Sequence, residues 1–172
     1  MTKDKENDTI VVHTTMELIK WKNKIKLDAV MVQKEIFKNC LYFSANKLAR
    51  IISKLAEEIF YKTGLNPSYA FAQMLINNNP GLNQNELAKR LAIMPSTLTR
   101  FLEKLELMEL IKREQNGKSS NVYPTAKGAE KQQELAECWM ALHKRYSEIL
   151  GADYGDNLSE MVYSSAVKLE NR

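Results

Sequence analysis

The stretch LAIMPSTLTRFLEKLE, residues 91–106, combines one apolar stripe with an unusual outer face. Its leucines recur at three- and four-residue steps, which predicts an amphipathic helix over 95–107. The outer face opens with proline, small hydroxyls and Arg100, where a helix that only covers a core usually shows Lys and Glu to water. A helix fits the major groove of B-DNA, and its N-terminal residues then meet base edges and phosphates. The stretch therefore predicts a DNA-reading helix, against the simpler alternative of ordinary caps followed by a solvated arginine.

The segments on either side predict a helix-turn-helix that carries a β-hairpin. Before the stretch, Asn83 is a candidate N-cap and Glu86 follows three residues later, so we expect a short helix that ends near Ala92. After it, a strand begins at 110–111, a polar Asn-Gly turn follows, and 121–123 form the return strand. A hairpin of this size is only marginally stable alone, so it must lie against the helices as a wing.

The remaining residues predict helices, so the fold class is mainly α with a small β-hairpin wing. Asn66 and Thr125 are candidate N-caps, and GADYGDN, residues 151–157, is expected to break the last long helix. Apolar residues at helical spacing predict helices over 32–62, 67–77, 126–150 and 158–169. The expected parts are an N-terminal extension at 1–31, partly disordered, a helical dimerisation region at 32–64 and 126–172, and a winged helix-turn-helix DNA-binding domain at 65–125.

Composition and cysteine content exclude several other classes of protein. No run approaches the ~18 apolar residues that a membrane-spanning helix needs, and no secretion signal opens the chain, so we expect a cytoplasmic protein. Cys40, Cys138 and the two histidines stand at no metal-ligand spacing, and we find neither a phosphate-binding glycine loop nor a Ser-His-Asp arrangement. We therefore predict no cofactor and no enzymatic activity. The net charge of +4 is only a weak pointer to nucleic acid.

The N-terminal extension contains four lysines at alternate positions between Lys20 and Lys26. The preferred interpretation is an accessory amphipathic helix. A basic arm on DNA phosphates and a membrane-surface helix stay open as alternatives, although no membrane partner is predicted.

The candidate DNA contacts lie at the start of the first helix of the motif, on its second helix and on the wing. Small hydroxyls let the backbone approach DNA closely, and Arg100 can bind guanine or phosphate bidentately. The wing adds positive charge that can lie along the DNA backbone. The candidate residues are Gln84, Pro95, Ser96, Thr97, Thr99, Arg100, Lys104, Arg113, Lys118 and Ser119.

The same region resembles the DNA-binding core of the MarR family of transcriptional regulators. The matching segments are ELAKRL, PSTLTRFLEKLE, LIKR and YPTAKG within 82–130, and CLYFSANKLARII more weakly resembles the first family helix. The resemblance implies a homodimer that binds double-stranded DNA at a palindromic operator, dimerises through its first and last helices, and usually represses transcription. It also implies release by a small-molecule effector or an oxidant. A winged-helix interaction module with weak DNA binding stays open as the alternative.

Two positions depart from the family's pattern. The family often has Gly in the turn and Ser before the Pro, whereas here the turn is AIMPS with Met94 at the cap, so we expect the helix start to rely on Ser96. The wing tip reads Asn-Gly-Lys where the family often has Asp-Arg-Arg. This change removes a bidentate arginine and leaves Lys118 to neutralise a phosphate.

The resemblance also suggests a sensor. One branch of the family senses oxidants through a cysteine near the position of Cys40, supported by nearby tyrosines, and Tyr42 stands two residues on. The alternative is a buried small hydrophobe, as free cysteine usually is, and we expect that role for Cys138. The resemblance also implies a ligand pocket, although side chains of this kind at helical spacing more often form the core. The candidate lining residues are Tyr42, Tyr69, Phe71, Met74 and Trp139.

Overall fold

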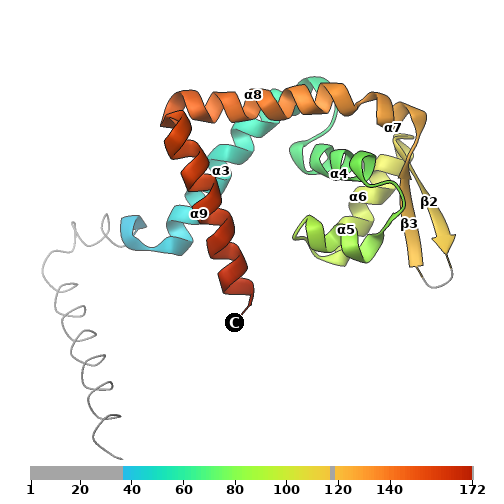
Figure 1. Cartoon of the computed structure of the whole chain (residues 1–172), viewed down its shortest axis with the longest axis horizontal. Coiled ribbons are helices and arrows are strands. Elements are labelled where there is room, and N and C mark those ends of the chain that lie inside the picture. Colours follow the sequence, from blue (N-terminus) through green and yellow to red (C-terminus); the bar gives the residue numbers. More distant parts are fainter. Residues whose placement is uncertain (1–36, 117–118, 172) are drawn as a thin grey trace, which may run out of the picture. The chain divides into compact units, whose positions relative to one another are not determined.

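The computed structural model describes residues 37–116 and 119–171 (Figure 1). The predictions for the N-terminal extension, and for Lys118 at the wing tip, lie outside the described residues. The chain falls into two compact units, which divide after Ile51. The larger unit contains the winged helix and the helices that follow it.

The elements follow in the predicted order and carry the labels of Figure 1. The helices before the wing are α3 (Leu41–Phe60), the 3-10 helix η1 (Tyr61–Thr63), α4 (Pro67–Asn78), α5 (Gln84–Arg90) and α6 (Pro95–Leu107). The strands are β1 (Leu82–Asn83), β2 (Ile111–Asn116) and β3 (Ser119–Pro124). The helices after the wing are α7 (Ala126–Glu130), α8 (Gln132–Leu150) and α9 (Ala152–Glu170). The prediction of a mainly α fold with a small wing is confirmed.

Three predicted side chains cap helices of the larger unit. The side-chain oxygens of Asn66, Asn83 and Thr125 each accept from the N–H of the third helical residue, at 3.0, 2.9 and 3.0 Å. Each bond satisfies one of the amides that a helix start leaves open. Glu86 does not complete a capping box on α5, because its carboxylate accepts from Arg90 Nε at 2.9 Å instead.

The wing belongs to a three-stranded antiparallel sheet with the order β1-β3-β2. The β2–β3 pairing runs from Ile111 opposite Pro124 to Asn116 opposite Ser119. Strand β1, which pairs with β3 at Val122 and Asn121, was not predicted, because two residues carry no periodicity. Since Asn83 ends β1 and also caps α5, the sheet is joined directly to the helix-turn-helix.

The core of the larger unit is built from α4, α5, α6, the sheet and α8. Figure 1 shows α4 below α8, with α5 and α6 beyond it. Burying one leucine side chain contributes about 1.5–3 kcal/mol, so the leucines of α6 determine which face of that helix points outward. The largest fully buried side chains are Phe60, Ile76, Leu87, Leu98, Leu102, Leu105, Leu110, Leu135, Gln73, Val122 and Cys138.

Two predicted helices are interrupted by single residues. The first helical run has a break at Cys40, so that α3 begins at Leu41. The long helix after the wing is broken at Lys131, which lies between α7 and α8. Neither break is marked by Gly or Pro, so the local sequence carried no signal for it.

The predicted break at 151–157 was wrong in extent. Only Gly151, at φ +88°, interrupts the helix, and α9 begins at the next residue. Gly155 is buried against α8, where an added Cβ would lie 3.4 Å from the Tyr146 ring. Packing against α8 thus overrides the weak helix propensity of a polar, glycine-containing stretch.

Helices α5 and α6 both end in a Schellman motif without glycine. Ala92, at φ +51°, and Glu109, at φ +60°, occupy the left-handed position. In each motif the following N–H bonds the carbonyl five residues back, at 3.1 Å after α5 and 2.9 Å after α6. Left-handed backbone costs an L-residue roughly 1–2 kcal/mol, so both turns are strained.

Ala92→Gly is therefore expected to stabilise the protein. Relief of the left-handed strain outweighs the greater freedom of glycine in the unfolded chain, so we expect a gain of about 0.5–1 kcal/mol in the free energy of unfolding. Urea denaturation measures this change. As a control, Ala141→Gly on the exposed side of α8 should lower the same quantity by about 1 kcal/mol. If both variants change the free energy of unfolding in the same direction, the prediction is wrong.

Candidate nucleic-acid interface

Helix α6 turns its leucine stripe inward and its predicted contact residues outward. Leu98, Leu102 and Leu105 are at most 1% exposed. We call the opposite side the outer face of α6. It contains Pro95, Ser96, Thr99, Arg100 and Lys104, all exposed, together with the half-buried Thr97.

The start of α6 has backbone amides without a helix partner. Met94 is the N-cap and makes no side-chain hydrogen bond, and Pro95 has no N–H. The first helical bond runs from the Leu98 N–H to the Met94 carbonyl at 3.0 Å, which leaves the amides of Ser96 and Thr97 open. The expectation that Ser96 caps this helix was therefore wrong. Open amides at a helix start are suited to binding phosphate.

Two cations on the outer face are unpaired. Within the described part of the chain, neither Arg100 nor Lys104 makes a hydrogen bond or ion pair through its side chain. Thr99, by contrast, donates its hydroxyl to the Pro95 carbonyl at 3.0 Å. Because Arg100 and Lys104 have no internal partner to give up, they can meet base edges or phosphate directly.

The cations at the base of the wing are paired. Arg113 Nε donates to Glu106 Oε2 at 3.0 Å, and Arg113 Nη2 donates to the same oxygen. Lys112 Nζ lies 2.7 Å from Glu114 Oε1 and 5.6 Å from the Tyr123 ring centroid. The hydrogen bond to Glu114 raises the pKa of Lys112. Arg113, a candidate DNA contact, is thus held against the end of α6.

The remaining candidate residues are Gln84, at the start of α5, and Lys118 and Ser119, in the wing. Gln84, at the first position of α5, donates through Nε2 to Ser120 Oγ at 3.0 Å, so it links the helix-turn-helix to β3. Ser119 belongs to β3 by its backbone, while Lys118 lies outside the described residues. Sequence patterns had not revealed that Glu106 holds Arg113, because the pair forms across a change from helix to strand.

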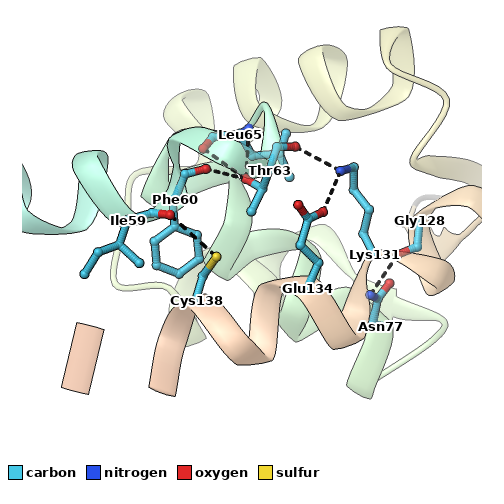
Figure 2. Close-up of polar contacts among 9 residues, drawn as sticks. All are labelled: Ile59, Phe60, Thr63, Leu65, Asn77, Gly128, Lys131, Glu134 and Cys138. Carbon is cyan, nitrogen blue, oxygen red and sulfur yellow. Dashed lines mark hydrogen bonds and ion pairs between the residues drawn. The ribbon is translucent and has the colours of Figure 1, made fainter. Parts of the chain in front are cut away.

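The two cysteines differ in their surroundings. Cys40 is half-buried just before α3, and the neighbouring Tyr42 ring packs edge-on against Phe43 with centroids 5.7 Å apart. Cys138 is fully buried and its thiol donates to the Ile59 carbonyl at 3.6 Å (Figure 2). Burial raises the pKa of Cys138, which disfavours the reactive thiolate. The redox role of Cys40 stays a prediction.

Of the candidate pocket residues in the larger unit, Tyr69 and Met74 are partly buried against the core, whereas Phe71 and Trp139 are exposed. The Tyr69 ring lies 4.8 Å from that of Phe101, and the Phe71 ring lies 5.6 Å from that of Phe60. Met74 packs against the core, while Trp139 is 50% exposed. Their assignment to a ligand pocket stays a prediction. Among the described residues, no cluster of three potential His, Cys, Asp or Glu ligands could hold a metal ion, and no helix has the length and apolar character needed to cross a membrane.

The family model of the MarR family matches residues 65–119, which run from before α4 to the start of β3. The winged helix-turn-helix is thus similar to the MarR family over these residues. The match covers the outer face of α6 and the base of the wing. The resemblance predicted from ELAKRL and PSTLTRFLEKLE is confirmed.

Solved MarR-type structures share the fold over three quarters of the chain. The transcriptional repressor CouR, bound to a 23-mer DNA duplex, superposes with a TM-score of 0.70 at 24% identity over 76% of this chain and 95% of that chain. CouR bound to p-coumaroyl-CoA gives 0.70 at 23% identity, over 76% and 94%. The S. aureus MepR–DNA complex gives 0.66 at 16% identity, over 76% and 98%. No curated protein sequence matches the chain significantly.

Proposed function

We propose that this chain is a sequence-specific DNA-binding transcriptional regulator. It acts in the cytoplasm as a homodimeric repressor on a palindromic operator. The observation that carries this proposal is the outer face of α6, which combines two open amides with two unpaired cations, Arg100 and Lys104. In a major groove, the amides suit phosphate and Arg100 suits guanine. The MarR-type fold supports the same geometry, since relatives of this fold are known in complex with DNA duplexes.

The helices after the wing support dimerisation. In α9, Gly155 is the one residue counted as buried, so most of this helix is exposed in the single chain. Large exposed apolar side chains mark an interaction surface, and a second copy of the chain is the usual partner in two-fold oligomers. The exposed apolar residues of α8 and α9 include Trp139, Met140, Ile149, Tyr154, Met161, Val162 and Tyr163.

Salt-dependent binding tests the proposal. Duplex DNA would first be selected from a random pool with the wild-type protein, and its affinity then measured between 50 and 200 mM salt. A dimer that neutralises about two phosphates, through Lys104 of each protomer, should lose about 10-fold in affinity over this range. Sedimentation equilibrium should give twice the chain mass of 19.8 kDa. A protein that selects no sequence, or whose binding ignores salt, would refute the proposal.

A second candidate function is a protein-interaction module with weak DNA binding. The paired state of Lys112 and Arg113 favours it, because the base of the wing then offers little free charge to phosphate. The unpaired cations of α6 favour the regulator. The selection experiment separates the two, since an interaction module would form the same dimer without enriching any DNA sequence.

Release by a small ligand or an oxidant completes the proposal, with Cys40 as the candidate thiol. If Cys40 is the sensor, hydrogen peroxide should release wild-type protein from its selected duplex, while Cys40→Ser should stay bound under the same treatment. Cys138→Ser serves as the matched control, because burial protects that thiol, and it should still be released. Release of Cys40→Ser by peroxide would rule out Cys40 as the sensor.

A further inference from the structure

We infer that Asn77 is a positioning residue, which fixes the joint between α7 and α8 and thereby sets the half-site spacing that the dimer accepts. The inference rests on the proposed function. It concerns the placing of the recognition helix rather than its contacts with DNA. The joint is the single residue Lys131, where the long helix after the wing is interrupted.

One side chain bridges both sides of this joint. Asn77 Nδ2 donates to the Gly128 carbonyl in α7 at 3.0 Å and to Gln132 Oε1, at the first residue of α8, at 2.9 Å. Figure 2 shows Asn77 directed at Gly128 beside the Lys131 side chain. Asn77 itself belongs to α4, in the winged helix. A single amide thus ties the winged helix to the end of α7 and the beginning of α8 at once.

The amide of Asn77 is itself held in place. Gln73 is fully buried, and its Nε2 donates to Asn77 Oδ1 at 2.8 Å and to the Leu110 carbonyl at 3.4 Å. Gln73 Oε1 has no hydrogen-bond partner in the described part of the chain. A buried amide with one unsatisfied atom stabilises less than an apolar side chain of the same size would. Its presence here therefore favours a role in orientation over one in stability.

The joint is held from a second side by η1. Lys131 Nζ donates to the Thr63 carbonyl at 2.9 Å and lies 3.2 Å from Glu134 Oε2 (Figure 2). Gln132 Nε2 also donates to Asn78 Oδ1 at 3.4 Å. Polar contacts from α4 and η1 therefore surround a break that has no capping side chain of its own.

The angle between α7 and α8 determines where the far end of α8 lies, and therefore how the dimer can sit on DNA. Helix α8 has 19 residues, which gives a length of about 28 Å. A change of about 10° at Lys131 would move its far end by about 5 Å, which exceeds the 3.4 Å rise of one base pair. Because α8 leads to the proposed dimer surface, the two recognition helices would shift relative to each other by a comparable distance. Because Asn77 holds the α7–α8 joint at one angle, the dimer binds half-sites at one defined spacing.

The experiment measures affinity for duplexes in which the two half-sites of the selected operator are moved in steps of one base pair. The wild type should show one optimal spacing. For Asn77→Ala, we expect the preference for that spacing over its neighbours to fall about tenfold, with the affinity for a single half-site unchanged. Gln132→Ala removes the partner in α8 alone and should give the same change to a smaller extent, which covers the case that Asn77→Ala does not fold.

The matched control is Asn79→Ala in the same turn. Asn79 bonds the Leu75 carbonyl and Arg90, so its loss lowers stability without touching α7 or α8. Its spacing profile should equal that of the wild type. An unchanged profile for Asn77→Ala or Gln132→Ala, or a wild type that binds its selected DNA without any preferred spacing, would overturn the inference. A wild type that selects no DNA overturns the proposed function first, and the inference with it.

Discussion

Gly128→Ala is expected to abolish the cooperative fold of the winged helix. A Cβ atom at this position would lie 1.9 Å from the Leu110 carbonyl oxygen and 2.7 Å from Gln73 Nε2. The closest atom is backbone, and Thr125 N–H already bonds that oxygen at 3.0 Å, so it cannot move without breaking the connection between α6 and the wing. We expect a loss of at least about 4 kcal/mol in the free energy of unfolding, at the upper end of what single substitutions cause.

Urea denaturation followed by circular dichroism measures this loss, and Gly155→Ala is the matched control. Both glycines are helical and buried, but a Cβ on Gly155 would lie 3.4 Å from the Tyr146 ring and 3.8 Å from Ser147 Oγ, which are ordinary contacts. The control should be neutral or gain up to about 1 kcal/mol from helix propensity. A free energy of unfolding for Gly128→Ala within about 1 kcal/mol of the wild-type value would resemble the effect of an ordinary surface substitution. That result would show that α7 does not approach Leu110 as closely as described.

Arg100→Ala should produce the largest loss of DNA affinity among single changes on the outer face of α6. If the guanidinium reads guanine, the cost is about 1–3 kcal/mol, or roughly 5- to 150-fold in the dissociation constant, and it is confined to one base position. Binding to operators substituted at each position in turn, measured by fluorescence anisotropy, resolves this pattern. A uniform loss on all sequences would show instead that Arg100 contacts phosphate.

Lys112→Ala provides the comparison for Arg100→Ala. Lys112 is engaged by Glu114 and lies over Tyr123, so its removal should change DNA affinity by less than about threefold. Circular dichroism would verify that both variants are folded. A loss for Lys112→Ala equal to that for Arg100→Ala would mean that the pairing of wing cations does not persist on DNA.

Local signals made the helix-turn-helix predictable. The caps at Asn66, Asn83 and Thr125 depend on side chains within three residues of the bonded amide, and the α6 stripe repeats within one helix. The same reasoning placed Arg100 and the hydroxyls outward, because burying the leucines leaves no other orientation. Features that depend only on residues close together in the chain can be predicted from the sequence alone.

Contacts between distant segments could not be predicted in this way. The interruption at Lys131 depends on Asn77 and Thr63, which lie more than fifty residues earlier in the chain. The sequence also does not show whether a cation is free or paired. Arg113 and Arg100 could not be distinguished until the structure placed Glu106 beside Arg113. The free and the paired candidate contacts could therefore be told apart only from the three-dimensional structure of the helix–strand junction.

The pairing of the wing cations has a consequence for how the protein would search a genome. Non-specific residence on DNA depends on phosphate neutralisation, which also sustains sliding along the duplex. With Lys112 and Arg113 held by Glu114 and Glu106, a dimer has fewer charges to keep it on an incorrect site. Such a protein would leave incorrect sites quickly and travel more through solution than along the helix. Its target would then be recognised chiefly by the time spent bound there.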